Sequence, residues 1–362
     1  MFRDPTRRDA MRMLAATAAA FGSLMSGPAC GYAHARHSSG GLPYGAAVRW
    51  SALEHDDAYR AALLERCQIV VPEGEMKWAD LRPTRDVFQF ENADYIADFA
   101  RRNGLALRGH TLAWYGAMPE WTNAITTARE AERELVTHIE TVMSRYRDVV
   151  TSWDVVNEPV PDRPAGAEDL RPSVWTRCLG ESYIATAFRA AAAVDPRATL
   201  VLNDYDVEFV GGRFAARRDA LRHILRKLLD QGVPVHAVGL QGHLLAERAI
   251  DRDGLQAFLS EVKSWGLKVL ITELDVVDKT LPGLEAERDR LVALKAGDFL
   301  DAVFSVAKPE AVITWGVSDR YTWVPIYFTR DDGRPNRPLP LDADMRPKPM
   351  MAVIDRYLRR GL

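Results

Sequence analysis

The segment WDVVNEPV, residues 153–160, and the segment ITELDV, residues 271–276, decide the fold of this chain. Each is a run of apolar and β-branched residues that leads to a glutamate, Glu158 in the first segment and Glu273 in the second. This pattern is typical of a buried β-strand that carries an acidic side chain at its end. The sequence therefore predicts two buried strands, each of which presents a carboxyl group.

Similar short apolar runs alternate with helix-length segments along the rest of the chain, as in parallel βα units. The predicted strands begin near Gly45, Ile69, Ala106, Ser152, Thr199, Val238, Val269 and Val312. The predicted helices cover residues 93–103, 128–146, 183–194, 214–231, 254–265, 288–306 and 349–359. Eight strands separated by helices indicate an α/β fold, a (β/α)8 TIM barrel formed by a single domain.

Polar and aromatic side chains lie at or just beyond the ends of these predicted strands. They are His110, Asn157, Glu158, Asn203, Gln241, His243, Glu273 and Trp315. In a barrel of this type the carboxyl ends of the strands form the catalytic face. Polar groups that follow runs of Val, Ile and Leu are costly to bury without partners, so a binding face explains them best.

A pair of carboxyl groups on one catalytic face suits the hydrolysis of a glycosidic bond. One group must stay protonated and act as an acid, while the other stays ionised and acts as a nucleophile. The alternative is that both glutamates are structural, since Asn-Glu-Pro also occurs in turns. The supporting residues that converge on the same face favour the catalytic interpretation.

Eight further segments follow one another in the order known from one enzyme family. After YGAAV at Tyr44 they are PEGEMKW, GHTLAW, WDVVNEP, LNDYD, GLQGHL, ITELDV, TWGVSDRYTW and LPLDADMRPKP, between Pro72 and Pro349. In this the chain resembles glycoside hydrolase family 10, the endo-β-1,4-xylanases and their relatives. The resemblance implies a (β/α)8 barrel and a retaining reaction on a β-linked polysaccharide.

The resemblance also implies roles for single residues. Glu158 corresponds to the acid/base and Glu273 to the nucleophile, whose carboxyl groups should lie about 5–5.5 Å apart. Asn157 is expected to donate to the sugar 2-hydroxyl. His243 and Asp275 are expected to form a relay behind Glu273 that keeps it anionic and oriented. The expected substrate-binding residues are Glu73, Lys77, His110, Trp114, Gln241, Trp315 and Trp323.

Two positions depart from the family pattern. Gly74 stands where the family usually has Asn, and this removes at least one hydrogen bond to the sugar, worth about 0.5–1.5 kcal/mol. Tyr115 follows the GHTLAW segment, where a histidine is usual. Neither departure touches the catalytic pair, but both leave the identity of the bound sugar open. Of the other tryptophans, Trp78 and Trp153 are expected in the core, and Trp121 is left undecided.

The first 35 residues read as a twin-arginine signal peptide rather than as part of the fold. Arg7 and Arg8 precede a thin apolar stretch that is too short to span a bilayer, and Ala33-His34-Ala35 fits a cleavage site. Cys30 raises the alternative of a lipoprotein, although Pro28 suits a lipobox poorly. We expect export to the periplasm or the medium, and a mature domain of residues 36–362.

The composition of this mature domain makes several classes of function unexpected. Residues 1–35 contain four arginines and two aspartates, so a net charge of −3 becomes −5 without them. This mild acidity gives no reason to expect binding to nucleic acid or to an anionic membrane. No CxxC or HExxH motif suggests a metal site, so we expect no metal and no cofactor. Cys67 and Cys178 read as small core residues, although a disulfide between them stays open.

The sequence thus predicts a retaining endo-1,4-β-xylanase that acts as a monomer on xylan or a related polysaccharide. A rival enzymatic hypothesis is hydrolysis of another β-linked polymer, such as a bacterial exopolysaccharide, and Gly74 keeps this rival open. A rival of another class is a non-catalytic carbohydrate-binding barrel. Such a protein is expected to lose one of the two glutamates, and both are present.

Overall fold

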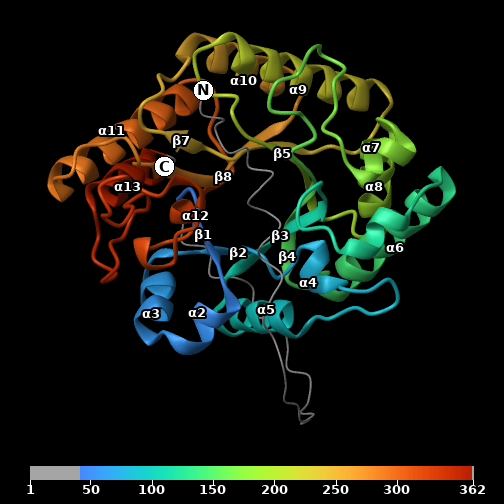
Figure 1. Ribbon diagram of the computed structural model, residues 1–362, viewed down its shortest axis with the longest axis horizontal. Coiled ribbons are helices and arrows are strands. Elements are labelled where there is room, and N and C mark those ends of the chain that lie inside the picture. Colours follow the sequence, from blue (N-terminus) through green and yellow to red (C-terminus); the bar gives the residue numbers. More distant parts are fainter. Residues whose placement is uncertain (1–40, 361–362) are drawn as a thin grey trace.

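The computed structural model describes residues 41–360, and the predicted signal peptide lies outside the described residues. Within that range the chain forms a closed parallel barrel surrounded by helices (Figure 1). The barrel strands are β1 (Tyr44–Val48), β2 (Ile69–Pro72), β3 (Ala106–Ala113), β4 (Val150–Asn157), β5 (Thr199–Asp204), β6 (Ala237–Leu240), β8 (Lys268–Val277) and β9 (Val312–Thr314). The sheet closes where β6 pairs with β8 and β9 pairs with β1. The predicted TIM barrel is confirmed.

Each predicted strand is present and begins within two residues of its predicted start, the largest difference being Ser152 against Val150. The burial of the strands explains this accuracy. All five residues of β1 and all four of β6 are buried, so these strands read as continuous apolar runs. A further strand, β7 (His243–Leu245), was not predicted, and it pairs with the outer part of β8.

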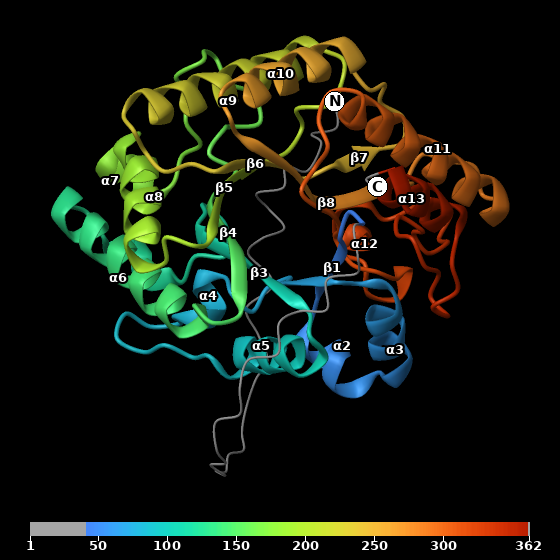
Figure 2. The ribbon, with the colours of Figure 1, turned by 180° about the vertical axis from the view of Figure 1, so that it is seen from behind.

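Helices cover the outside of the barrel on all sides (Figures 1 and 2). The long ones are α3 (Asp57–Arg66), α5 (Glu91–Asn103), α6 (Ala128–Tyr146), α8 (Ser182–Val194), α9 (Gly212–Asp230), α10 (Arg252–Ser264), α11 (Glu285–Phe304) and α13 (Pro349–Arg360). Shorter helices are α2 (Trp50–His55), α4 (Trp78–Leu81), α7 (Val174–Leu179) and α12 (Val324–Phe328). The predicted helices correspond to seven of the long ones.

Local signals explain where the helices begin and end. The Thr127 side chain accepts a hydrogen bond from the Glu130 N–H at the start of α6. Along α6, Leu135, Ile139 and Val142 recur at helical spacing and are buried against the barrel. Gly104 ends α5 with a φ of 65°, a conformation that glycine adopts without steric cost.

The tryptophans and cysteines of the core follow the predictions. Trp78 and Trp153 are each 1% exposed and belong to the main hydrophobic core. Trp121, which the sequence left undecided, is half-buried and donates its indole N–H to the carbonyl of Arg82 at 3.0 Å. Cys67 is buried, Cys178 is half-buried, and both are free thiols, so they form no disulfide.

No helix among residues 41–360 is both long and apolar enough to cross a membrane.

Candidate active site

The two predicted catalytic glutamates reach the same end of the barrel from different kinds of backbone. Glu158 directly follows β4, as predicted, and its φ of 54° lies in the left-handed region. Glu273 was predicted to end its strand, and this is wrong, because β8 continues to Val277. The extension exists because β7 pairs with β8 beyond the barrel, with His243 opposite Asp275.

Both carboxylate oxygens of Glu273 are held by donors. Asn203 Nδ2 donates to Oε1 at 2.7 Å, and His243 Nε2 donates to Oε2 at 3.0 Å. Burial favours the neutral acid, but the hydrogen bond from His243, the charges of His110 and His243, and the bond from Asn203 outweigh it. Together they lower the pKa of Glu273 to about 2, so this carboxyl is ionised in the free protein.

His243 lies between two carboxylates, as the predicted relay requires. Its Nδ1 donates to Asp275 Oδ1 at 2.9 Å, while its Nε2 faces Glu273. Two ionised carboxylates are acceptors only, so both ring nitrogens must carry protons and the ring is an imidazolium. Burial opposes this charge, but Asp275 and Glu273 raise the pKa of His243 to about 9. Trp323 extends this series of hydrogen bonds, because its indole N–H donates to Asp275 Oδ2 at 2.7 Å.

Glu158 has a different environment. Its Oε1 accepts a hydrogen bond from Gln241 Nε2 at 2.9 Å, while its buried Oε2 has no partner among the described residues. Glu158 is 5% exposed, so it is shielded from bulk water, and only one of its two carboxyl oxygens has a hydrogen-bond donor among the described residues.

Three amide side chains connect the two glutamates. Asn157 Oδ1 accepts from Asn203 Nδ2 at 2.8 Å and from Gln241 Nε2 at 3.2 Å. The same two donors also bind Glu273 and Glu158, respectively. Because both donors fix the Asn157 oxygen, the Asn157 Nδ2–H groups remain for a ligand. The order Glu158, Gln241, Asn157, Asn203, Glu273 is thus one continuous hydrogen-bonded row.

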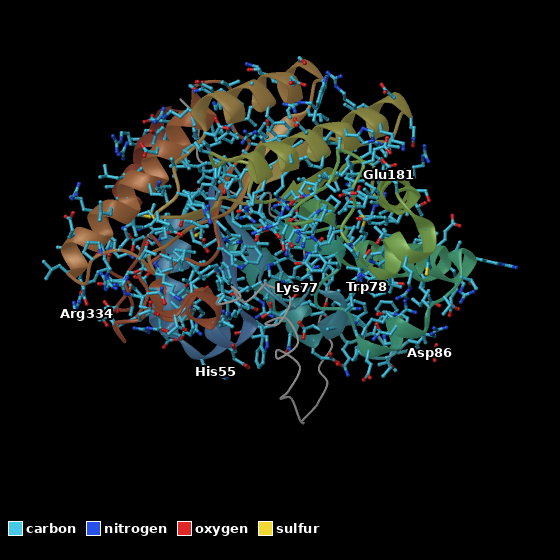
Figure 3. The ribbon with its side chains drawn as sticks, turned by 45° about the horizontal axis from the view of Figure 1, so that its top comes forward. His55, Lys77, Trp78, Asp86, Glu181 and Arg334 are labelled. Carbon is cyan, nitrogen blue, oxygen red and sulfur yellow. The ribbon has the colours of Figure 1, made fainter. Side chains whose placement is uncertain are left out.

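Aromatic and basic side chains gather beside this row. The Lys77 ammonium lies over the rings of Trp114 and Trp315, at 4.9 and 5.8 Å from their centroids. Trp315 in turn meets His110 edge-on at 5.1 Å, and Trp323 meets His243 at 5.0 Å. Figure 3 shows Lys77 near the middle of the barrel. These residues provide flat apolar surfaces and donors together, which is the combination that binds sugar rings.

The His110 ring is oriented by Asp154, which forms a buried ion pair with Arg108. Its Nδ1 lies 2.9 Å from Asp154 Oδ2, and Asp154 also binds Arg108, which is 1% exposed. The contact with the carboxylate fixes the orientation of the imidazole ring and leaves Nε2 on the other side of the ring. Trp114 Nε1 is buried and has no partner among the described residues.

Glu73 is placed differently from what its predicted role suggests. Arg49, at the end of β1, binds both of its carboxylate oxygens, with Nε at 2.6 Å and Nη2 at 2.7 Å. The Glu73 side chain is 16% exposed, and that of Arg49 is 35% exposed. A carboxylate has further acceptor positions, so Glu73 remains able to accept from a sugar hydroxyl as part of this pair.

The two departures from the family pattern have clear structural surroundings. Gly74 has no left-handed φ, and a Cβ atom there would lie 3.4 Å from Asp80 Oδ2 with no other neighbour within 4 Å. Tyr115 packs edge-on against Trp114 at 5.5 Å and lies under the guanidinium of Arg171 at 4.5 Å.

The structure brings most of the predicted site residues together, whereas the side chain of Glu73 is bound by Arg49. The sequence placed Asn203 on the binding face without a role, and the structure shows it bound to Glu273, while Arg49 and Arg171 were not predicted as site residues. Within residues 41–360 no group of three His, Cys, Asp or Glu side chains has the arrangement of a metal site. The chemistry available is that of two carboxyl groups in unequal environments, one ionised with donors on both oxygens and one with a donor on a single oxygen.

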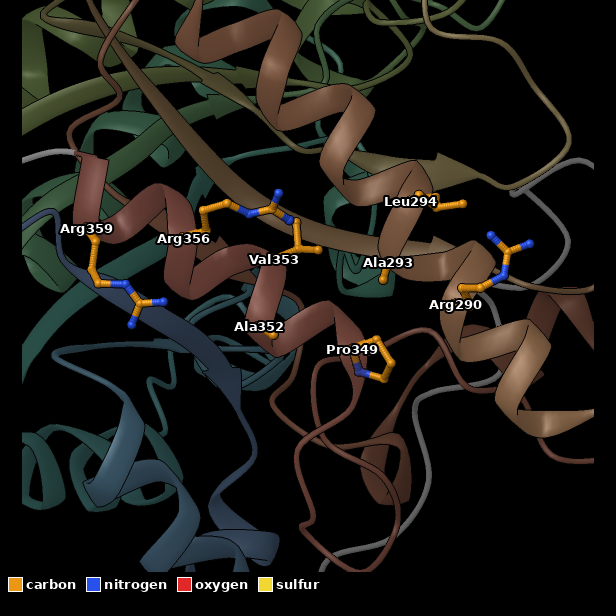
Figure 4. Close-up of a pocket in the computed structure, with 8 residues that line it drawn as sticks. All are labelled: Arg290, Ala293, Leu294, Pro349, Ala352, Val353, Arg356 and Arg359. Carbon is orange, nitrogen blue, oxygen red and sulfur yellow. The ribbon is translucent and has the colours of Figure 1, made fainter.

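A separate hollow of about 510 Å³ lies on the outside of the barrel, between α11 and α13 (Figure 4). It is lined by Arg290, Ala293, Leu294, Pro349, Ala352, Val353, Arg356 and Arg359. None of the predicted site residues lines it.

Two enzymes are similar to this chain in sequence, and a solved structure is similar to it in fold. An endo-1,4-β-xylanase 1 from Humicola insolens is 33% identical over 342 residues, covering 92% of this chain and 76% of that protein. An endo-1,4-β-xylanase B from Paenibacillus barcinonensis is 33% identical over 84% of this chain and 92% of its own. The structure of xylanase 10B from Thermotoga petrophila in complex with xylobiose superposes with a TM-score of 0.79 at 30% identity, covering 88% of this chain and 94% of that one.

The sequence profile described as Glycosyl hydrolase family 10 matches residues 33–356. This match includes both catalytic-site strands and every predicted site residue. The chain belongs to glycosyl hydrolase family 10.

Proposed function

We propose that this protein is a retaining endo-1,4-β-xylanase, which cleaves internal β-1,4-xylosidic bonds through a covalent glycosyl-enzyme intermediate. The observation that carries the proposal is the unequal environment of the two glutamates. Donors hold both oxygens of Glu273, and its pKa is about 2, whereas Oε2 of Glu158 has no partner among the described residues. One nucleophile and one proton donor are what a retaining glycosidase requires.

In the first step a carboxylate oxygen of Glu273 attacks the anomeric carbon. The bond between that carbon and the leaving oxygen breaks, and Glu158 gives its proton to this oxygen. In the second step the ionised Glu158 takes a proton from water, and the water oxygen attacks the same carbon. The Glu273 carboxylate leaves, and both side chains return to their starting protonation states.

The surrounding residues support this sequence of steps. The His243 imidazolium keeps Glu273 ionised until attack, and Asp275 keeps the imidazole charged. The free Nδ2–H groups of Asn157 suit the sugar 2-hydroxyl, whose hydrogen bond strengthens in the transition state. Lys77 and the neighbouring indoles suit the sugar on the non-reducing side.

The names of the most similar relatives support xylan as the polymer. A second candidate, another β-linked polysaccharide, is favoured by one observation: Gly74, next to the predicted sugar-binding residue Glu73, has no side chain, and a Cβ atom there would meet only Asp80 Oδ2, at 3.4 Å. The test is to assay the purified mature protein on xylan, cellulose, mixed-linkage β-glucan and acidic bacterial exopolysaccharides, with sizing of the products. Internal cleavage of xylan with an initial β-anomer by NMR supports the proposal. An initial α-anomer contradicts the double displacement.

We also propose that the protein is exported through the twin-arginine route and acts as a monomer. The Arg7-Arg8 pair and the Ala33-His34-Ala35 segment support export. The double substitution Arg7→Lys with Arg8→Lys should leave precursor in the cytoplasm, whereas the unchanged chain should yield mature protein that begins at Arg36. Normal export of the double variant, or a lipid on Cys30, contradicts the route. Sedimentation of the mature protein tests the monomer.

A further inference from the structure

We propose that Arg171 is a positioning residue for Glu158, which it holds through the backbone of the loop between β4 and α7. The inference rests on the proposed role of Glu158 as acid/base. Arg171 lies 13 residues after Glu158, outside the family segments quoted above.

The backbone at Glu158 requires such support. Its φ of 54° is a conformation that side-chain-bearing residues rarely adopt, and it persists only where the surroundings enforce it. On the N-terminal side, Glu158 N–H donates to the carbonyl of Asn203 at 2.8 Å. The carbonyl of Glu158 needs a donor on the other side, and Arg171 Nε supplies it at 3.1 Å.

Arg171 binds three consecutive carbonyl groups of this loop. Besides the Nε bond to Glu158, its backbone N–H donates to Pro159 at 2.7 Å, and its Nη2 donates to Val160 at 2.7 Å. Arg171 thus fixes the path by which the loop leaves β4, with its side chain at Glu158 and Val160 and its backbone N–H at Pro159. If the peptide after Glu158 turned, the carboxyl group would turn with it and lose its alignment with the leaving oxygen.

The guanidinium is itself fixed on several sides. Nη2 also donates to Asp162 at 3.0 Å and to the Tyr205 hydroxyl at 2.7 Å. The rings of Tyr115 and Tyr205 lie 4.5 and 5.6 Å from the guanidinium carbon. Burial favours neutral Asp162, but the charge of Arg171 and the hydrogen bonds lower the pKa of Asp162 to about 2.

Tyr115 gives this arrangement a feature specific to this chain. A histidine at position 115 would be able to carry a positive charge next to Arg171, whereas the tyrosine ring offers a neutral π face to it. The departure from the family at Tyr115 and the position of Arg171 thus form one contact. Through Arg171 this contact is joined to the main chain of the acid/base.

Arg217 provides a matched control. It is fully buried and also donates to the carbonyl of Val160, at 3.2 Å, and to the backbone of Tyr205, at 3.1 Å. Among the described residues it makes no hydrogen bond to the side chain or the carbonyl of Glu158. Removing either arginine weakens the same loop, but only the loss of Arg171 frees the carbonyl of the acid/base itself.

The experiment compares kcat/KM for two aryl β-xylobiosides, one with a 2,4-dinitrophenyl and one with an unsubstituted phenyl leaving group. The first needs no proton from Glu158 and the second does, and kcat/KM reports the step in which the leaving group departs. Arg171→Met should lower the phenyl value about 10- to 100-fold and the dinitrophenyl value by less than about threefold. Arg171→Lys, which keeps the charge but loses the planar fork, should lie between Met and the unchanged protein.

The control variants distinguish a wrong assignment of Glu158 as the acid/base from a wrong role for Arg171. Glu158→Ala should show the same split more strongly, and a Glu158→Ala protein without the split contradicts the proposed function itself. Arg217→Lys, assayed at a temperature below the Tm of that variant, should lower kcat/KM for the two aryl xylobiosides by the same factor. If Glu158→Ala shows the split while both Arg171 variants lower the two values equally, Arg171 only stabilises the loop and the inference fails. It fails also if neither Arg171 variant folds, because Arg171 is then required for the fold.

Discussion

The two glutamates of the active site differ in what holds them. Glu273 sits inside a strand, β8, and its side chain is fixed at both oxygens by donors from β5 and β7. Glu158 sits just outside its strand on a left-handed residue, with one oxygen bound and its backbone held by Arg171. The nucleophile is therefore fixed through its carboxylate, while the acid/base is fixed mainly through its main chain. The ionisation of Glu273 is thus set by donors to its side chain, whereas the orientation of Glu158 is set mainly by its backbone contacts.

The largest effect should come from the nucleophile. Glu273→Gln keeps the size of the side chain, but an amide cannot form the glycosyl ester. We expect kcat to fall by about 10⁵-fold or more on every substrate, including activated aryl xylobiosides. Steady-state assays with a freshly purified protein, checked for contaminating enzyme, measure this. More than trace turnover would mean that the nucleophile has been wrongly assigned.

The second prediction tests whether the acid/base differs from the nucleophile in kind. Glu158→Ala should lower kcat/KM on phenyl β-xylobioside by about 10²–10⁴-fold, since general acid catalysis is worth that much. The dinitrophenyl substrate should react almost as fast in its first step, so a burst of dinitrophenol should precede slow turnover. An equal loss of kcat/KM on both substrates would show that Glu158 does not act as the proton donor to the leaving group.

The third prediction concerns the charge that holds Glu273. Because the pKa of His243 is raised to about 9, its imidazolium persists at neutral pH and is lost as the pH rises through about 9. The pKa of Glu273 is lowered from 4.5 to about 2, so the stability that this carboxylate contributes is complete above about pH 4.5 and is lost progressively as the pH falls toward 2. The stability that the His243 imidazolium contributes is complete below about pH 6.5 and is lost as the pH rises through about 9. We therefore expect the full stabilisation by this pair between about pH 4.5 and 6.5.

Asp275→Asn removes the carboxylate that raises the pKa of His243 most. We expect the alkaline limb of kcat/KM to move to lower pH, with about a 10- to 100-fold loss at neutral pH. A pH–rate profile from pH 4 to 10 measures both effects. The exposed Asp86 offers a control, because Asp86→Asn should leave the profile unchanged. An unmoved alkaline limb in Asp275→Asn would show that His243 does not set it.

The smallest effect should come from a position that contacts neither glutamate. Gly74→Asn adds a side chain on the sugar-binding side, next to Asp80 Oδ2, and the φ of Gly74 adds no strain. If the sugar is xylose and the amide reaches it, one hydrogen bond of about 1 kcal/mol should raise kcat/KM on xylo-oligosaccharides several-fold at most. The leaving-group difference between the glutamates should not change.

The neighbouring aspartate gives this test its control. In an Asp80→Ala background the added amide has no carboxylate to bind, so any gain on xylo-oligosaccharides should be larger than in the presence of Asp80. Thermal stability must be measured alongside the kinetics. A stable Gly74→Asn protein with lower activity on xylo-oligosaccharides would count against xylan and in favour of a larger or branched sugar.

Much of the fold was predictable because the barrel strands are largely buried and contain short apolar runs, which are continuous in β1, β2 and β6. The strand that begins at Val312 is only three residues long and was still located. The short β7 was not predicted, since three residues are too few to show a periodicity, even though Gly242 directly precedes them. That miss also explains the wrong end of β8, because the extension of β8 exists only through its pairing with β7.

The sequence by itself determined the barrel and the delivery of Glu158 and Glu273 to one face, because parallel strands place their carboxyl ends together. It also indicated that Asp275 shares a side of its strand with Glu273, since the two residues are two apart, while His243 was expected from the family resemblance. Only the tertiary structure decided how these groups are held. Asn203 reaches Glu273 across 70 residues, and Gln241 reaches Glu158 across 83. Such contacts depend on how strands and loops pack, which no local pattern in the chain records.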